Sequence, residues 1–222
     1  MHLQFSSNFK TIFSILLIGL MLFFVYLMVR ITIPYFSFRY DVGFLLTKQA
    51  VIHLPIWRQA FYLHIGISSF VLLIGIFQFV KPLIRKRPKM HRWLGKTYVI
   101  LVVFFCAPSA FVMALYANGG IWAKTSFAIT ASLWCVFTFL AYKYAREKNF
   151  KLHIANMYRS YALTLTAITL RLYVLVLPHF FILHALQMYT LVAWLSWVPN
   201  LIIAELLIRR WRRIGSPIPG RN

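Results

Sequence analysis

The amino-acid sequence predicts an all-α, polytopic membrane protein with six transmembrane helices and both termini on the cytoplasmic side. Three observations support this prediction: an apolar composition, six separable apolar segments, and basic residues gathered on one side of those segments. Hydrophobic residues make up 61% of the 222 residues and charged residues only 12%, about half the share of charged residues in a soluble domain. An ordinary soluble domain is therefore excluded.

Six apolar segments are long enough to cross the hydrocarbon core of a bilayer as helices. They are residues 11–29, 59–80, 97–117, 125–144, 160–180 and 185–208. The first is too long for the core of a signal peptide and lacks a small-x-small cleavage site, so we expect it to remain as the first span. Because the spans are joined by short connections, residues 1–222 are interpreted as a single membrane domain.

The basic residues predict the orientation of these spans. The largest group lies between the second and third spans: Lys81, Arg85, Lys86, Arg87, Lys89, Arg92 and Lys96. Further groups lie between the fourth and fifth spans and after the sixth. By the positive-inside rule this side is cytoplasmic. We interpret the Lys81–Lys96 loop first as the segment that sets the topology of the protein. The alternative, functional interpretation is that it binds anionic lipid headgroups.

Composition excludes several function classes. The formal net charge is +21 with only three acids, but a mean hydropathy of +0.74 is not that of a nucleic-acid-binding protein. So few carboxylates leave little room for glycosidase, kinase or carboxylate-metal chemistry, and no phosphate-binding loop or hydrolase motif is present. Cys106 and Cys135 have no CxxC spacing, so we interpret both as small buried hydrophobic residues.

Polar residues inside the spans are costly in a bilayer and are therefore candidate functional residues. Arg171 lies near the middle of the fifth span, with no acid predicted at its depth. Helical periodicity places His153, Ser160, Thr164 and Arg171 on one stripe of that span. In the second span His64, Ser68, Gly75 and Gln78 share a face, where Gly75 would allow close approach of a neighbouring helix or a flat cofactor.

Each of these polar residues also has a structural interpretation. Arg171 could cap backbone carbonyls exposed by kinks or hydrogen-bond to neighbouring helices. Arg159 is expected to extend to the cytoplasmic headgroups, and Glu205 could pair with Arg209 one helical turn later. Pro108 and Pro199 lie inside the third and sixth spans, and we expect them to kink those helices.

The histidines divide by predicted depth. His64 and His184 lie toward the outer side, whereas His91 and His153 lie toward the cytoplasmic side. This arrangement is what a transmembrane cytochrome needs, because each haem b takes two imidazoles from different helices and places arginines near its propionates. The candidate cofactor-binding residues are therefore His64, His91, His153, His184 and Arg171. The alternative is that these histidines are ordinary interfacial side chains.

Two stretches carry a family resemblance: "HRWLGKTY" from His91 to Tyr98, and "HIANMYRSYALTLTAITLRLY" from His153 to Tyr173. With the helices between them they resemble the domain-of-unknown-function 2306 family of predicted bacterial multi-pass membrane proteins, over about residues 60–175. The resemblance implies a bacterial inner-membrane location and transfers no catalytic role. It adds Arg92, Gly95 and Arg159 to the candidate residues, and Gln78 lies in the same region.

The sequence favours a b-type haem or quinone-linked transmembrane redox protein. Two alternatives stay open at this point: a non-enzymatic small-solute transporter whose polar stripes line a path, and an accessory or assembly subunit that binds a membrane protein partner or a second copy of itself. Whether the protein is an enzyme is left open. No nucleic-acid partner is expected.

Overall fold

The structure, a computed structural model, describes residues 7–213, and within this range it contains helices and no strand. Six of its helical segments are long and apolar enough to cross a membrane. The predicted fold class, an all-α membrane protein with six spans, is therefore confirmed. Residues 1–6 and 214–222, which include Arg221 of the predicted basic C-terminal group, lie outside the described residues.

The first span is formed by α1 (Ser7–Thr32) and the second by α2 (Pro55–Phe77). After the short α3 (Lys81–Lys86), the third span joins α4 (Pro88–Ile100), η3 (Leu101–Cys106) and α5 (Ala107–Leu115). The fourth span is α6 (Gly120–Arg146). The fifth joins α7 (Phe150–Thr164), α8 (Thr166–Val176) and η4 (Leu177–His179), and the sixth joins α9 (Ala185–Leu195) and α10 (Val198–Arg213).

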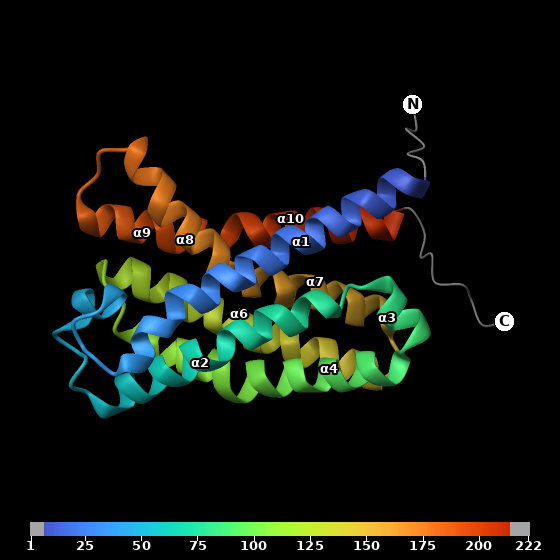
Figure 1. Cartoon of the computed structure of the whole chain (residues 1–222), viewed down its shortest axis with the longest axis horizontal. Coiled ribbons are helices and arrows are strands. Elements are labelled where there is room, and N and C mark those ends of the chain that lie inside the picture. The colour runs from blue at the N-terminus through green and yellow to red at the C-terminus, as the bar shows by residue number, and fades with distance from the viewer. Residues whose placement is uncertain (1–6, 214–222) are drawn as a thin grey trace.

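These spans form one elongated bundle with two distinct ends (Figure 1). We call the end that holds α3 and the α6–α7 connection the basic end, and the end that holds residues 33–54 and the α8–α9 connection the loop end. The start of α1 and the end of α10 both lie at the basic end (Figure 1). The assignment of the basic end to the cytoplasm stays a prediction from the distribution of positive charge.

Three of the spans are interrupted near the middle. Residues Leu101–Cys106 form a π-helix directly before Pro108, and the sixth span is interrupted at residues 196–197, directly before Pro199 in α10. An irregular segment therefore lies next to each proline, as predicted, because proline cannot donate a helical hydrogen bond. The third break, at Leu165 between α7 and α8, was not predicted.

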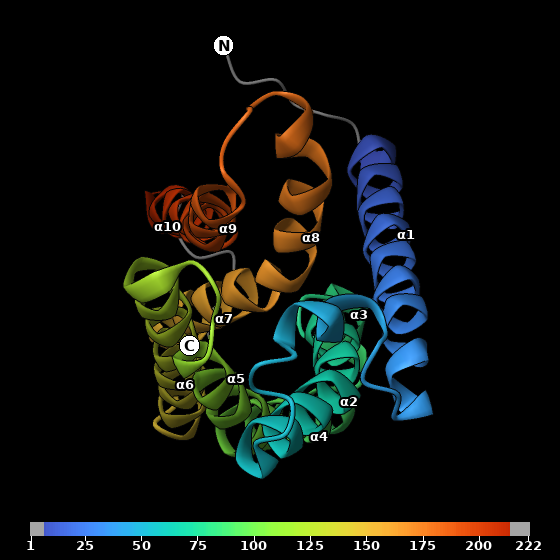
Figure 2. The same ribbon diagram turned by 90° about the vertical axis from the view of Figure 1, so that its left-hand side faces the viewer.

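The break at Leu165 has a local cause in hydroxyl side chains. Thr164 and Thr169 each donate a side-chain hydrogen bond to a carbonyl one turn earlier, on Ser160 and Leu165. Such bonds compete with the backbone ladder and bend helices. As a result α8 leans away from α7, toward the side of the bundle where α1 lies (Figure 2).

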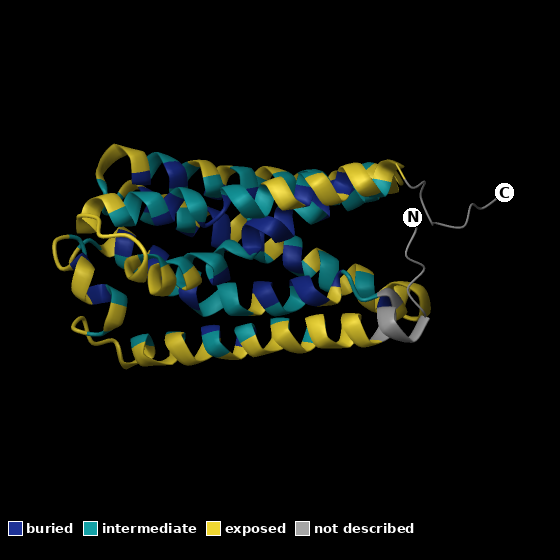
Figure 3. Ribbon diagram, turned by 90° about the horizontal axis from the view of Figure 1, so that it is seen from above, coloured by how far each residue is buried: buried dark blue, intermediate teal, exposed yellow. Residues whose placement is uncertain are grey.

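Packing of the helices is uneven. The centre of the bundle buries residues from α2, α4, α6, α7 and the α9–α10 junction, among them Val71, Tyr98, Trp134, Met157 and Trp197. In contrast α1 packs mainly against α2 and is exposed along most of its length (Figure 3). Exposed apolar side chains on such a helix are expected where lipid is the solvent.

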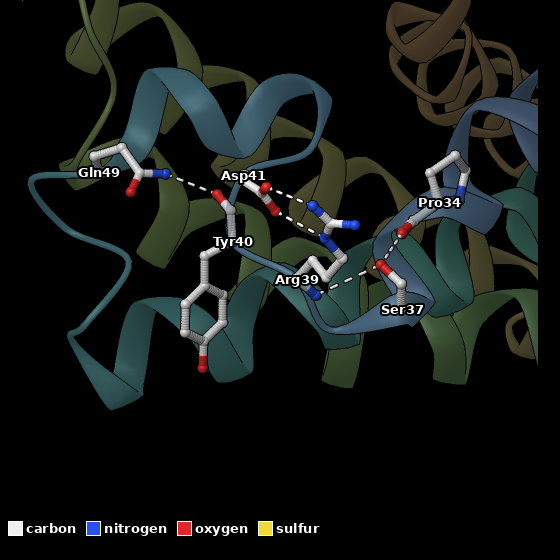
Figure 4. Close-up of polar contacts among 6 residues, drawn as sticks. All are labelled: Pro34, Ser37, Arg39, Tyr40, Asp41 and Gln49. Atoms are coloured by element: carbon white, nitrogen blue, oxygen red, sulfur yellow. Dashed lines mark hydrogen bonds and ion pairs between the residues drawn. The ribbon is translucent and has the colours of Figure 1, made fainter.

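Residues 33–54 form a folded cap over the loop end. Two short 3₁₀ helices, η1 (Ile33–Ser37) and η2 (Gly43–Lys48), pack on the start of α2 through a cluster that includes Leu45, Ile52, Trp57 and Phe61. The exposed Arg39–Asp41 ion pair and a hydrogen bond from Gln49 to the Tyr40 carbonyl order the intervening turn (Figure 4). The guanidinium of Arg39 holds the pKa of Asp41 below its usual value.

A buried lysine joins this cap to the next connection of the chain. Lys48 is 3% exposed, and its Nζ donates to the Tyr116 carbonyl at 2.8 Å and to Asn118 Oδ1 at 2.9 Å. Burial, with a smaller contribution from the charge of Lys124, lowers the pKa of Lys48 to about 8. The cap is thereby fixed to the α5–α6 connection.

Candidate functional site

The candidate site at the basic end begins with His153 in the first turn of α7. The helix starts there because the Asn149 side chain accepts a hydrogen bond from the Leu152 amide. His153 Nδ1 lies 2.8 Å from the Ala141 carbonyl of α6. A carbonyl can only accept, so Nδ1 donates the proton and Nε2 keeps a free lone pair. A hydrogen bond of this kind orients metal-binding histidines.

The second imidazole at this end is His91, in the first turns of α4. Its Nδ1 is buried and has no hydrogen-bond partner among the residues that the structure describes. His91 and His153 both lie near the start of a helix, α4 and α7, at the basic end. The two histidines that the sequence assigned to the cytoplasmic side therefore lie at the same end of the bundle, on different helices.

Gln78 and Gly95 lie beside this histidine pair. Gln78 ends α2 and is buried, and its Nε2 has no partner. Its Oε1 would lie 3.1 Å from a Cβ placed on Gly95, one helical turn beyond His91. A larger residue at position 95 would press on the Gln78 amide. The basic end thus combines two unpartnered polar groups, on Gln78 and His91, with one orienting hydrogen bond on His153.

A different polar group lies in the half of the bundle toward the loop end. His64 Nδ1 donates to the Cys106 carbonyl at 3.1 Å, and Ser109 Oγ lies 3.4 Å from the same nitrogen. Cys106 is the last residue of the π-helix, and its carbonyl also accepts from Ser109 Oγ at 3.0 Å. His64 Nε2 is therefore left as an acceptor, as at His153.

Arg171 has no carboxylate partner in the described part of the chain. Its Nη1 donates to the Ala167 carbonyl one turn earlier at 2.7 Å. Among the described residues the acids are Asp41, Glu147 and Glu205, which form ion pairs with Arg39, Lys143 and Arg159, respectively. The hydrogen bond to the Ala167 carbonyl matches the capping role considered for Arg171. Most N–H donors of the guanidinium have no partner among the described residues.

The predicted polar stripe of the fifth span is divided by the break at Leu165. Ser160 and Thr164 belong to a buried network of hydrogen bonds. Tyr98 Oη lies 2.9 Å from Ser160 Oγ and 2.7 Å from Thr164 Oγ1. Trp134 Nε1 donates to Thr164 Oγ1 at 3.0 Å, and Thr138 Oγ1 lies 2.6 Å from Ser160 Oγ. We call these five residues the central network. The sequence did not indicate its members on α4 and α6.

Two further expectations are corrected by the packing. Of the two alternatives for Gly75, the close approach of a neighbouring helix is confirmed and the flat cofactor is not, because the ring of Tyr161 on α7 lies where a Cβ would be. Arg159 does not extend freely to headgroups; it forms a two-point ion pair with Glu205 of α10, with Nε–Oε1 at 2.5 Å and Nη2–Oε2 at 3.0 Å. The expected Glu205–Arg209 pair is replaced by this contact between helices.

The remaining predicted residues lie at the surface. His184 is exposed, and its Nδ1 accepts from the Leu186 amide at 3.4 Å as part of the capping box of α9. This gives the histidine a structural task that the sequence did not indicate. Arg92 is exposed beside His91. No group of three or more His, Cys, Asp or Glu side chains suited to a bare metal ion occurs within the described range.

Comparison with known proteins gives the family but no activity. No curated protein and no solved structure matches the chain. A family model described as "Predicted membrane protein (DUF2306)" matches residues 61–208. The match begins within α2 and extends through most of α10, further toward the C-terminus than the resemblance over residues 60–175. Because it covers well over half of the sequence, the chain belongs to the DUF2306 family of predicted membrane proteins.

Proposed function

We propose that this membrane protein is a transmembrane redox protein that binds haem b at the basic end, with His91 and His153 as the axial ligands. The observation that supports the proposal is the placement of these two imidazoles at the same end of the bundle, on α4 and α7, with His153 oriented by its hydrogen bond and His91 Nδ1 buried without a partner among the described residues. Each would offer one ring nitrogen to the iron. Bound haem b would supply one-electron transfer, and the residues of the chain would bind and orient it.

The polar groups at the basic end fit such a ligand. The hydrogen bond from His153 Nδ1 to the Ala141 carbonyl fixes the tautomer in which Nε2 can bind iron. The buried Nδ1 of His91 has no partner, and a buried polar atom without a partner costs roughly 1–3 kcal/mol. A ligand-bound His91 would turn and remove this cost. Exposed Arg92 next to it would supply positive charge to the haem propionates.

The two alternatives from the sequence are less well supported. A transporter needs a polar path, but Ser160 and Thr164 of the predicted stripe are hydrogen-bonded to Tyr98, Thr138 and Trp134 inside the central network. An assembly subunit accounts for the exposed face of α1 but not for the unpartnered groups beside His91. The redox proposal accounts for both histidines.

The proposal is tested by the visible spectrum of the purified protein, expressed with ample haem and kept in mild detergent. We expect a Soret band and, after dithionite reduction, sharp α and β bands. His91→Ala and His153→Ala should each lower the haem content at least tenfold. His184→Asn is the matched control, because asparagine preserves an N-cap, and it should retain the wild-type spectrum.

Colourless wild-type protein would refute the proposal. So would full haem content in both His91→Ala and His153→Ala, because the iron would then be bound elsewhere. Thermal unfolding of each variant in the same detergent separates loss of a ligand from loss of the fold: a variant that loses haem yet unfolds at the temperature of the haem-free wild type has lost a ligand only.

A further inference from the structure

We infer that a hollow at the loop end binds the phosphate headgroup of an anionic phospholipid, whose acyl chain follows one face of α2. The hollow has a volume of about 510 Å³ and lies between the turn after η1 and the first turns of α2. Its lining residues are Phe38, Tyr40, Arg58, Gln59, Tyr62 and Leu63. It lies at the opposite end of the bundle from α3 and the Lys81–Lys96 loop (Figure 1), and the inference does not depend on the proposed haem.

Aromatic rings in fixed positions form the walls of the hollow. The 3₁₀ helix η1 ends at Phe38, which has a left-handed backbone with φ of 56° and donates from its amide to the Tyr35 carbonyl at 3.1 Å. This conformation is uncommon for a residue with a side chain, and such residues are found at ligand clamps. The centre of the Phe38 ring lies 5.1 Å from that of Tyr62. The backbone of Tyr40 is held by the hydrogen bond from Gln49 (Figure 4).

Arg58 supplies an unmatched positive charge to the hollow. Its Nη1 donates to Tyr40 Oη at 2.9 Å, and the guanidinium lies 5.9 Å from the centre of the Tyr40 ring. A guanidinium has five N–H donors, and this is the one side-chain hydrogen bond found for Arg58 within residues 7–213. Of the acids in that range, Asp41 of the neighbouring turn pairs with Arg39, and the other two pair elsewhere. The hollow therefore favours an anionic group.

Tyr62 adds a hydroxyl that lacks a partner. Its Oη is buried and makes no hydrogen bond to any residue that the structure describes, although Tyr62 lines the hollow. A buried polar atom without a partner is costly, and a phenol can donate to a ligand oxygen. The exposed Gln59 amide, three residues earlier on α2, offers further donors. Arg58, Gln59 and Tyr62 thus bring donors to one hollow, which suits a group with several acceptor oxygens.

A stripe of exposed apolar side chains leads away from the hollow along α2. Leu63 lines the hollow, and Phe70 and Phe77 follow it at intervals of seven residues; all three are exposed. Seven residues make close to two helical turns, so these side chains share one face. Residues 63–77 span about 21 Å at about 1.5 Å per residue, more than the roughly 15 Å that one leaflet contributes to a hydrocarbon core of about 30 Å. The stripe offers an acyl chain a continuous apolar surface from the hollow into the bilayer.

The ligand class follows from these properties. A phospholipid without an ammonium group meets all of them, because its phosphate accepts from Arg58 and Tyr62 and its acyl chain follows the stripe. A choline or ethanolamine headgroup would place a cation beside Arg58, and like charges repel. A free phosphate compound has no chain for the stripe. A fatty acid has the charge and the chain, but its carboxylate fills little of a hollow of about 510 Å³.

The test measures lipid binding to the purified full chain by native mass spectrometry in mild detergent. The probes are dioleoyl phosphatidylglycerol and, with the same chains, dioleoyl phosphatidylcholine; oleate and glycerol phosphate test the chain and the phosphate separately. We expect phosphatidylglycerol to bind roughly tenfold more tightly than each of the others, the effect of one hydrogen bond to a charged group. Arg58→Gln should weaken its binding roughly tenfold, and Tyr62→Phe, which removes one hydroxyl, roughly threefold.

Arg30→Gln is the matched control. It changes an exposed arginine in the last turn of α1 that does not line the hollow, and it should bind phosphatidylglycerol as the wild type does. An equal loss in this variant would overturn the inference, because the attraction would then come from the net charge of the loop end rather than from the hollow.

Equal affinity for phosphatidylglycerol and phosphatidylcholine would also overturn the inference, as would unchanged binding in Arg58→Gln. Glycerol phosphate that binds as tightly as the lipid would identify the ligand as a free phosphate compound, and oleate that binds as tightly would show that a carboxylate suffices; either result excludes the phospholipid. Thermal unfolding in the same detergent shows whether each variant folds. If Arg58→Gln fails to fold, Tyr62→Phe decides the question.

Discussion

The ion pair between Arg159 on α7 and Glu205 on α10 gives a quantitative test of how the sixth span is held to the bundle. The pair makes two hydrogen bonds, and its side chains are 20% and 36% exposed. Exposed pairs contribute about 0–1 kcal/mol, whereas removal of one partner from a buried pair costs about 3–5 kcal/mol. For this half-buried geometry we expect Glu205→Gln to lower the free energy of unfolding by about 2 kcal/mol.

Such a change is measurable as a shift in thermal midpoint. For a chain of this length 1 kcal/mol corresponds to about 2–4 °C, so Glu205→Gln should lower the midpoint in detergent by about 4–8 °C. Glu147→Gln is the matched control. Its carboxylate is half-exposed and lies 3.9 Å from Lys143 Nζ in an i,i+4 pair. Such pairs contribute about 0.3–0.5 kcal/mol, so its loss should shift the midpoint by no more than about 2 °C.

A double-mutant cycle isolates the contact itself. Arg159→Leu should cost more than Glu205→Gln alone, because it also removes a cation–π contact with the Phe137 ring at 5.6 Å. The double variant should be more stable than the sum of the two single losses predicts, by about 1 kcal/mol or more, which is within the range measured for residues in contact. Strict additivity of the two losses would refute the reasoning.

Three further predictions test packing, charge and topology. Gly75→Ala should destabilise the protein by about 1–3 kcal/mol, the usual cost of overpacking, because a Cβ overlaps the Tyr161 ring; Gly19→Ala, which meets no atom within 4 Å, should show no overpacking cost in the same thermal assay. The pKa of Lys48 is lowered to about 8, so the charged form of its side chain is disfavoured in the folded state. The free energy of unfolding should therefore rise as pH increases from about 8 toward the ordinary lysine pKa of about 10.4. Lys48→Met should flatten this rise, and an unchanged slope would contradict the lowered pKa of Lys48. Charge-sensitive topology reporters inserted at Arg87, between α3 and α4, should be cytoplasmic, and an external signal would reverse the predicted orientation.

The spans could be predicted because their signal is local. Each needs only about 20 consecutive apolar residues, and the structure places helices at all six segments, several of them longer than predicted at one or both ends. Pro108 and Pro199 likewise carry their own signal. The break at Leu165 depends on two threonines whose hydroxyls donate to carbonyls one turn earlier. Whether a threonine hydroxyl forms such a bond depends on its neighbours in the fold, so the sequence does not predict this break.

Contacts between helices were predicted less well, because they depend on the rotation of each helix about its axis. Glu205 was expected to pair with Arg209 on its own helix, which sequence spacing can suggest, but it pairs with Arg159 on another. The space beside Gly75 is filled by Tyr161. The placement of His91 and His153 at the same end of the bundle could be expected from the sequence, since both stand near the start of a predicted span on the same side.

The division between satisfied and unsatisfied polar groups bears on the proposed function. Buried side-chain atoms without partners are found in the described residues on Trp57, Tyr62, Gln78, His91 and Thr166. Gln78 and His91 lie at the basic end, whereas Thr166 is the first residue of α8, next to the break at Leu165. Between these two regions the central network satisfies its own hydroxyls and the indole of Trp134. Because unpartnered buried polar groups are costly, they are best explained where a ligand completes them. A bundle with a closed polar centre and unpartnered groups at the basic end fits the proposed electron carrier better than it fits the passage of a solute.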